Sequence, residues 1–240
     1  DTWYRRQAKD GTCNTIFETS TNTWKVTVIN FVPGVIAADQ TICEGDDVAA
    51  FTSTTAASGD GTITYQWQSS ADNITFSDIA TATSATYDHG TLTADTWFRR
   101  AATSELNGKE CTEYSNVLKV TVNMLPEITV TPSSTINVQY SDPITSTTIA
   151  VTDDGAGSSL TASTEWKLGS GSFTSGLPSN LSLTAVLPVG TNSASWTLSG
   201  IANVVPGTYT IRITISDGQC SSYTDITLVV ACEDATVTYN

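Results

Sequence analysis

Residues 95–113 read DTWFRRAATSELNGKECTE, and nearly the same text stands at residues 1–15 as DTWYRRQAKDGTCNT. The shift of 94 residues that superimposes these two stretches also superimposes WKVTV at 24–28 on LKVTV at 118–122. The match loosens between these anchors, as expected for a surface loop that differs in length between two copies. An internal repeat of this length is a whole domain.

The repeat predicts how the chain is divided. We expect residues 32–123 to be one complete domain and residues 1–31 to be the C-terminal strands of a truncated further copy. Residues 124–231 have a different sequence with the same strand-like alternation, which predicts a second sandwich domain of slightly greater length. We expect residues 232–240 to be the start of a following unit.

Period-two alternation dominates the chain, and no window shows a sustained helical period. In TITYQWQSS, residues 62–70, Tyr65 and Trp67 alternate with glutamines, which predicts an aromatic pair on the inner face of a strand. The repeat contains seven short strand patterns separated by turn signals such as EGDD and LNGK, the number expected for an immunoglobulin-like sandwich with a core tryptophan. The sequence therefore predicts an all-β chain of tandem immunoglobulin-like β-sandwich domains arranged end to end.

The chain has five cysteines, an odd number. Cys43 lies near the start of the complete repeat and Cys111 near its end, so we expect a Cys43–Cys111 disulfide, which would stabilise the domain by about 4 kcal/mol in the chain-entropy model. Cys13 corresponds to Cys111 in the other copy. The partners of Cys13, Cys220 and Cys232 stay open, because an extended run between the last two would hold them roughly 30 Å apart. Disulfides indicate an oxidising, extracytoplasmic compartment.

Charge and motifs exclude several functions. The formal net charge is -14, and such a surface repels phosphate backbones, so we expect no nucleic-acid partner. No run of apolar residues is long enough to span a bilayer, so we expect no membrane insertion of this segment. The only histidine, His89, lies in a DHG turn without a nucleophile motif, and the sequence has no GxSxG, HExxH or phosphate-binding glycine loop. We expect no catalytic site.

Carboxylates in turns are the candidate metal ligands. Asp153 and Asp154 lie in TDDGAG, and Asp217 lies in SDGQ. Carboxylates at the ends of sandwich strands are oxygen ligands of the kind that calcium prefers, although none of these stretches has EF-hand spacing. Calcium is the only cofactor for which the sequence offers candidates, and solvated acidic turns are the alternative.

Two further patterns concern arginine and tryptophan. Arg99 and Arg100 are neighbours on one strand, as are Arg5 and Arg6, so one of each pair faces the interior. In so acidic a chain we expect structural salt bridges for them rather than anion recognition. The alternation of side chains along the strands places most tryptophans in the core. For Trp166 two interpretations stay open, core packing and an exposed platform for carbohydrate.

The residues also resemble known families. ICEGD at 42–46, YQWQSSADNITFSDI at 65–79 and KECTEYSNVLKVTVN at 109–123 resemble the repeated immunoglobulin-like domains of the giant SprB-like gliding-motility adhesins of Bacteroidota. GLPSNLSLT at 176–184 and GTYTIRITISDG at 207–218 are similar to a cadherin-like immunoglobulin domain family of bacterial surface proteins.

This resemblance implies a role for the matched positions and for the parent protein. Cys43, Trp67, Trp97 and Cys111 match scaffold positions, so we expect Trp97 to lie in the core with Trp67 and Tyr65, and no binding residue is carried over. The resemblance implies type IX secretion, an extracellular location at the cell surface, and contact with the motility and secretion machinery. It also implies that the parent protein binds extracellular polysaccharide or another substratum. We expect a non-catalytic stalk segment of a long adhesin involved in surface attachment and gliding motility. A glycan-binding module and an accessory region of a secreted polysaccharide-degrading enzyme are the alternatives.

Overall fold

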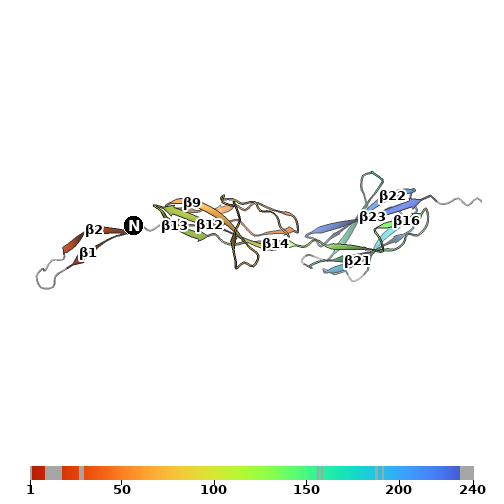
Figure 1. The fold of residues 1–240 in the computed structure, drawn as a ribbon. Helices are drawn as coiled ribbons and strands as arrows, with labels where there is room; N and C mark the ends of the chain where they lie inside the picture. Colours follow the sequence, from red (N-terminus) through yellow and green to blue (C-terminus); the bar gives the residue numbers. More distant parts are fainter. Residues whose placement is uncertain are drawn as a thin grey trace, which may run out of the picture. The chain divides into compact units, whose positions relative to one another are not determined.

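The computed structural model describes residues 2–8, 18–26, 30–155, 157, 159–186, 189–190 and 192–232. All regular secondary structure in these described residues is β-strand (Figure 1). The chain forms two compact units. Unit 1 comprises residues 1–40, 48–90 and 95–120, and unit 2 comprises residues 41–47, 91–94 and 121–240.

A two-stranded hairpin stands at the beginning of unit 1. It pairs β1 (Thr2–Ala8) with β2 (Glu18–Val26) in antiparallel fashion. The register joins Thr2 to Val26 and Tyr4 to Trp24, and it shifts by a bulge beyond Arg5. Such a pair of strands buries little by itself, and Tyr4 is 58% exposed.

The repeat is organised around one six-stranded sheet. Its order is β10 (Ser77–Asp78), β9 (Thr62–Ser70), β12 (Thr96–Leu106), β14 (Leu118–Asn123) and β5 (Gln40–Cys43), and β13 (Lys109–Tyr114) pairs with the far end of β12. Three short pairs complete the repeat: β3 (Phe31–Val32) with β8 (Ser58–Gly59), β4 (Val35–Ile36) with β7 (Ser53–Thr55), and β6 (Asp47–Val48) with β11 (Gly90–Thr91).

Aromatic packing forms the core of unit 1. Trp67 on β9 is fully buried, and its ring lies 5.7 Å from that of Phe51. Phe51, which lies outside the six-stranded sheet and bridges to Tyr87, packs against Phe98 of β12 with the ring centroids 4.8 Å apart. Tyr65 shares the inner face with Trp67 but is only half-buried at the margin of the core. The indole nitrogen of Trp67 donates to the Ser84 carbonyl, so its one polar atom is satisfied.

Trp97 does not belong to this core, in contrast to the expectation from the family resemblance. Phe98 and Arg100 of the same strand are fully buried. Because side chains alternate along a strand, Trp97 and Arg99 point to the outer face. Trp97 is half-buried there, with the Lys119 ammonium 5.3 Å from its ring centroid.

Unit 2 contains two sheets. One has the order β15 (Glu127–Thr131), β17 (Thr147–Thr152), β21 (Ser193–Gly200) and β20 (Leu181–Val186). The other has the order β16 (Thr135–Gln139), β23 (Ser221–Ala231), β22 (Gly207–Ser216), β18 (Thr161–Leu168) and β19 (Thr174–Ser175). Within unit 2, β16 runs parallel to β23, and the other paired strands of these two sheets are antiparallel.

The inner faces of these two sheets form the core of unit 2. Ile211, Ile213 and Ile215 of β22 are fully buried and alternate with polar residues, which is the pattern of a strand with one solvated face. Trp196 and Leu198 of β21 are buried in the same cluster. Both units are therefore built by burial of alternate side chains. The predicted fold class, an all-β chain with immunoglobulin-like sandwich units in tandem, is confirmed.

Candidate functional site

A disulfide joins Cys43 to Cys220, and both residues belong to unit 2. Their Cα atoms are 5.7 Å apart, and they are separated by 177 residues in the sequence. Cys43 is the last residue of β5, and Cys220 directly precedes β23. Cys111 and Cys232 are free thiols. The predicted Cys43–Cys111 disulfide is therefore wrong, and Cys13 lies outside the described residues.

Strand register explains why Cys111 cannot reach Cys43. Cys111 lies on β13 opposite Ser104 of β12. The backbone that follows Cys43 bonds to Asn123 at the end of β14, and β14 pairs with the Thr96 end of β12. Ser104 and Thr96 are eight residues apart on one strand, or about 27 Å. Disulfides require Cα atoms within about 7 Å of each other.

A buried carboxylate shapes the turn that carries Cys220. Asp217 is fully buried, and its Oδ1 atom accepts hydrogen bonds from the backbone N–H groups of Gln219 at 2.7 Å and Cys220 at 2.6 Å. Gly218, between Asp217 and Gln219, has a φ of 89°, a left-handed conformation that glycine adopts without steric cost. The Gln219 Oε1 atom in turn accepts a hydrogen bond from the side-chain Nδ2 of Asn123. The turn is therefore held from inside the unit.

The three calcium candidates lie near one another in unit 2, and the calcium site stays a prediction. The pKa of Asp153 is raised, chiefly by burial, with the charges of Asp154 and Asp217 adding to it against a backbone hydrogen bond from Gly155. The backbone amides of the turn occupy Oδ1 of Asp217, and Asp154 Oδ2 accepts from the Met124 amide at 3.2 Å. Among the residues described, no group of three or more His, Cys, Asp or Glu side chains is arranged to hold a metal ion.

Arg100 is the interior member of its pair, and its environment differs from the predicted salt bridge. It is fully buried, and Nη1 donates to Ser53 Oγ at 2.7 Å and to the Ala85 carbonyl at 2.5 Å. Its guanidinium carbon lies 4.4 Å from the ring centroid of Tyr65. Burial lowers the pKa of Arg100. Neutral oxygens and an aromatic face thus take the place of a carboxylate partner in the described part of unit 1.

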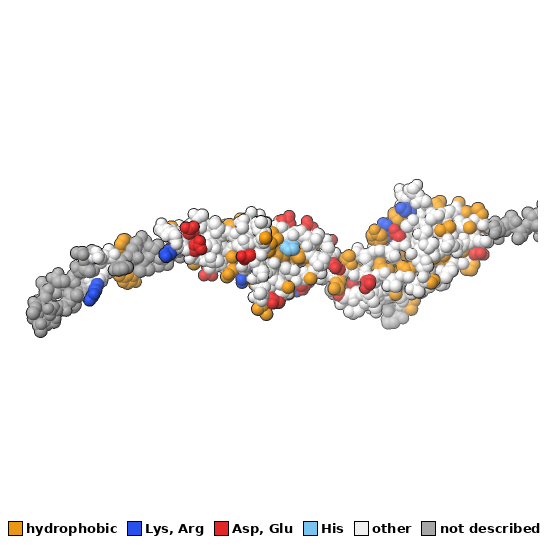
Figure 2. Space-filling model, in the orientation of Figure 1, with side chains coloured by type: hydrophobic (Ala, Val, Ile, Leu, Met, Phe, Trp, Pro, Cys, Tyr) orange, Lys and Arg blue, Asp and Glu red, His pale blue; other side chains and the backbone are white. Residues whose placement is uncertain are grey.

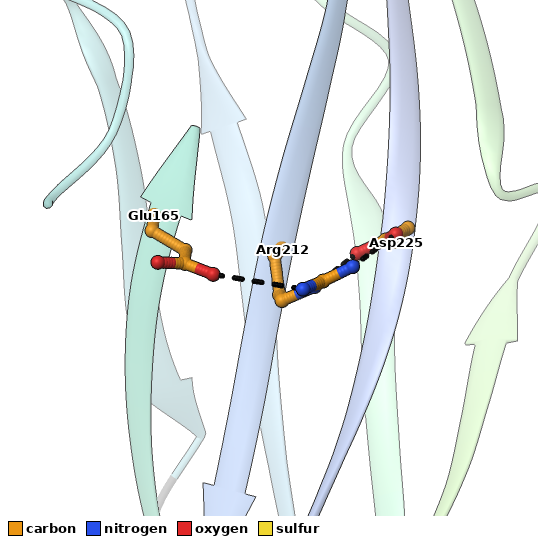
Figure 3. Close-up of polar contacts among 3 residues, drawn as sticks. All are labelled: Glu165, Arg212 and Asp225. Atoms are coloured by element: carbon orange, nitrogen blue, oxygen red, sulfur yellow. Dashed lines mark hydrogen bonds and ion pairs between the residues drawn. The ribbon is translucent and has the colours of Figure 1, made fainter. Parts of the chain in front are cut away.

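On the outer face of unit 2, Arg212 of β22 forms a polar cluster with Glu165 and Asp225 (Figure 3). Its Nε and Nη2 atoms donate to the two carboxylate oxygens of Asp225 at 2.8 and 2.9 Å, and Nη1 lies 3.8 Å from Glu165 Oε1. The hydrogen bonds to Asp225 raise the pKa of Arg212. The guanidinium also lies 4.0 Å from the ring centroid of Tyr223 and 4.6 Å from that of Phe173.

Unit 1 carries the same arrangement around Arg99. Its guanidinium carbon lies 4.1 Å from the ring centroid of Phe76 and 3.9 Å from that of Tyr114, and Nε donates to Gln68 at 2.7 Å. Gln68 is the cross-strand partner of Arg99, as Glu165 is of Arg212. In both units the guanidinium is surrounded by protein groups, so the cluster stabilises a solvated sheet face by cation–π contacts rather than offering a free anion site.

A groove of about 490 Å³ in unit 2 contains Trp166. The Trp166 ring lies 5.6 Å from that of Tyr209, and Tyr140, Ser179 and Asn203 line the same groove. Trp166 is half-buried, so it contributes both to the core margin and to this surface. The ring of His89 lies edge-on to that of Phe98, with the ring centroids 5.1 Å apart, in the aromatic packing of unit 1.

The surface carries scattered carboxylates and few basic side chains (Figure 2), in keeping with the net charge of -14. No helix capable of crossing a membrane occurs in the part of the chain that the structure describes.

Comparisons with known proteins give a family match for part of the chain. Residues 32–124 match the model of a domain of unknown function, DUF8696. No curated protein matches the sequence.

Solved structures with similar folds come from several sources. A fragment of the titin I-band is 14% identical, with a TM-score of 0.43 over 87% of this chain and 67% of that one. Three N-terminal domains of the bacteriophage RB49 outer capsid protein Hoc are 13% identical, with a TM-score of 0.42 over 86% and 70% of the two chains. The complex of Dpr2 with DIP-Theta gives 13% identity and a TM-score of 0.33, covering 96% and 73%.

Proposed function

We propose that the chain is a non-catalytic stalk segment of a long extracellular adhesin built from repeated β-sandwich domains. The observation that carries this proposal is a shared register. Thr2 pairs with Val26 in the β1–β2 hairpin, and Thr96 pairs with Val120 between β12 and β14. Both members of the pair are shifted by the same 94 residues, so one strand pairing occurs twice. Repeated copies of one structural unit are what an extended array contains.

The exposure of the hairpin supports the same proposal. Phe98 and Arg100 are fully buried in the complete repeat, where β9 pairs along β12. Their counterparts Tyr4 and Arg6 are exposed in the hairpin. A segment like residues 32–94, packed against β1, would bury these two side chains as β9 and its neighbours do in the complete repeat.

The chemistry of the disulfide supports the proposed compartment, and the family resemblance supports the proposed partners. The Cys43–Cys220 disulfide supports an oxidising compartment outside the cytoplasm, because cytosolic reductants keep most thiols reduced. In this proposal the parent protein lies at the cell surface and binds extracellular polysaccharide or another substratum. It also contacts the gliding and secretion machinery. Many copies of a weak binding module would then act together through avidity.

A fusion tests whether the hairpin belongs to a repeat. A second copy of residues 32–94 placed directly ahead of residue 1 recreates the residue order of the complete repeat. We expect the backbone amides of residues 2–8 to exchange hydrogen at least about tenfold more slowly in the fusion, because β1 gains a second strand partner. A matched fusion in which alanine replaces the added copy's equivalent of Trp67 should lose this protection. Unchanged exchange in the first fusion would contradict the proposal.

One observation favours a glycan-binding module as the second candidate function. The Trp166 groove combines the aromatic side chains of Tyr140 and Tyr209 with the neutral polar groups of Ser179 and Asn203, a chemistry suited to a neutral sugar. Retention of the whole chain on a glycan array tests it. Trp166→Ala should abolish retention, whereas Trp97→Ala, on the outer face of unit 1, should leave it unchanged. Equal retention of both variants would exclude the groove.

A further inference from the structure

The Cys43–Cys220 disulfide closes a covalent loop around most of the chain. Residues 44–219 lie inside this loop, and they include every described strand from β6 to β22. Only the residues up to 43 and from 220 onward lie outside it. A pull applied to the two ends of the chain follows the shortest covalent path, and the disulfide shortens that path by the whole length of the loop.

We infer that this disulfide has a mechanical function: it carries tension past the loop, so that force applied along the chain reaches neither the main body of unit 1 nor β15 to β22 of unit 2. The inference goes beyond the proposed adhesin function. It rests on the connectivity of one disulfide and does not require that the chain stand in a longer array.

The strands on either side of the disulfide suit this role. Cys43 ends β5, and Cys220 directly precedes β23, so tension passes from one strand through the disulfide into the next. A β-strand is already close to its maximal extension at about 3.3 Å per residue. Pulling β23 from Cys220 to Ala231 therefore adds almost no length, and the strand has no slack whose release would open the sheet.

β23 is also firmly anchored in its unit. It pairs with β22 along its whole length and with β16 on the other side. Ile226 and Leu228 are fully buried in the core. A load that ran along β23 would thus be held by two ladders of hydrogen bonds and by core packing, with the force directed along the strand and not across it.

The turn before β23 holds the attachment point in place. Cys220 is 2% exposed, and the Asp217 carboxylate accepts hydrogen bonds from its amide and from that of Gln219. Burial limits the access of reductants to the Cys220 sulfur. Unit 2 therefore positions and buries the Cys220 end of the load-bearing bond.

Without the disulfide, the path of force changes completely. Tension would run through every strand of the repeat and would enter unit 2 at residues 124–126, ahead of the edge strand β15. Unfolding would then release the full loop. A separation of 177 residues corresponds to a contour length on the order of 60 nm.

Single-molecule stretching of the whole chain tests the inference. The chain is tethered at both ends through enzymatically ligated peptide tags, which leaves all cysteines untouched, and is pulled before and after treatment with a reductant. The oxidised chain should release no more than on the order of 10 nm in any step, from the β1–β2 hairpin and from β3 to β5. The reduced chain should release on the order of 60 nm more in total.

Variants separate the disulfide from general effects of reduction. Cys43→Ser should release the additional length without reductant, and Cys111→Ser should behave like the unaltered oxidised chain. If Cys43→Ser does not fold, comparison of the same molecules before and after reduction still decides the outcome. Unfolding steps of tens of nanometres in the oxidised chain would overturn the inference. Because this test involves no second repeat, its failure would leave the array proposal standing, and failure of the repeat fusion would leave this inference standing.

Discussion

Arg212 in unit 2 is held in the same way as Arg99 in unit 1: each guanidinium lies between a phenylalanine ring and a tyrosine ring on the outer face of a sheet. The tyrosine is in each case paired with the residue two positions after the arginine, as Ala101 with Tyr114 and Thr214 with Tyr223. Two units with little sequence in common therefore stabilise the same solvated face by the same contact.

The two arginines of one strand should differ sharply in their contributions to stability. Arg100→Ala removes a buried side chain and leaves the Ser53 hydroxyl and the Ala85 carbonyl without their donor, so we expect a loss of about 3–5 kcal/mol in the free energy of unfolding. Arg99→Ala removes the outer-face cation–π contacts with Phe76 and Tyr114 and the hydrogen bond to Gln68, and should cost about 1–2 kcal/mol. Denaturant unfolding of both variants measures the difference, and equal losses would contradict the assignment of faces.

Trp67 and Trp97 form a second matched pair. Trp67→Ala should cost about 3–5 kcal/mol, because the ring is fully buried against Phe51. Trp97→Ala should cost about 1 kcal/mol, because Trp97 is half-buried on the outer face beside Lys119. Chemical denaturation monitored by circular dichroism avoids dependence on tryptophan fluorescence. A larger loss in the free energy of unfolding for Trp97→Ala than for Trp67→Ala would indicate that Trp97 is a core residue.

Sequence reasoning succeeded where the alternation of side chains determined the structure. GTYTIRITIS predicts a strand with one buried face, and β22 buries its isoleucines as that pattern requires. Alternation does not say which of two neighbouring large residues faces inward. Trp97 and Phe98 fit either face, and contact of Phe98 with Phe51 across the core decides between them.

The failure to predict the disulfide has a different cause from the ambiguity of strand faces. The position of Cys43 and Cys111 in one repeat predicts that they pair, but their proximity depends on strand register, which the sequence of a single copy does not specify. Cys220 lies 177 residues from Cys43, and nothing in the SDGQ turn marks it as a partner. NITFSDI, residues 73–79, alternates like a strand, but only Ser77–Asp78 forms one, because Asp72 accepts hydrogen bonds from the Ile74 and Thr75 amides and holds a turn there.

Asp153 should make unit 2 less stable as its carboxyl ionises. Burial and the neighbouring charges of Asp154 and Asp217 raise the pKa of Asp153 in the folded chain. A raised pKa means that the folded chain favours the protonated carboxyl. The stability that the protonated carboxyl contributes is present at pH values below the pKa of the unfolded chain and is lost as pH rises through the pKa of the folded chain. Asp153→Asn should therefore raise the thermal midpoint at pH 7 and have little effect near pH 3. A midpoint lowered equally at both pH values would contradict this.

Asp72 should behave in the opposite way. The backbone amides of Thr75 and Ile74, with help from the Ser70 hydroxyl, lower the pKa of Asp72 to about 2. A carboxyl whose pKa is lowered by folding stabilises the folded state. This stabilisation is present at pH values above the pKa of the unfolded chain and is lost as pH falls through the pKa of the folded chain. Asp72→Asn should lower the thermal midpoint at pH 7 and converge with the unaltered chain as pH approaches 2. Parallel pH profiles for the two chains would exclude this role of the turn.

Loss of the disulfide should weaken the folded state strongly. For a closed loop of 177 residues, the chain-entropy model gives about 5 kcal/mol for Cys220→Ser. Cys232→Ser, at an exposed free thiol, should change stability by about 0.5 kcal/mol or less. Urea denaturation under non-reducing conditions measures both, and similar values for the two variants would indicate that the Cys43–Cys220 bond does not form.

The most direct test of the account is to identify the partner of Cys43 in native protein. Intact cells are treated with a membrane-impermeant alkylating reagent, and the protein is then digested without reduction and mapped by mass spectrometry. The account predicts a cross-linked pair of peptides containing Cys43 and Cys220, with Cys111 recovered as an alkylated thiol. A Cys43–Cys111 pair, or an alkylated Cys43, would contradict both the load-bearing disulfide and the path of force derived from it.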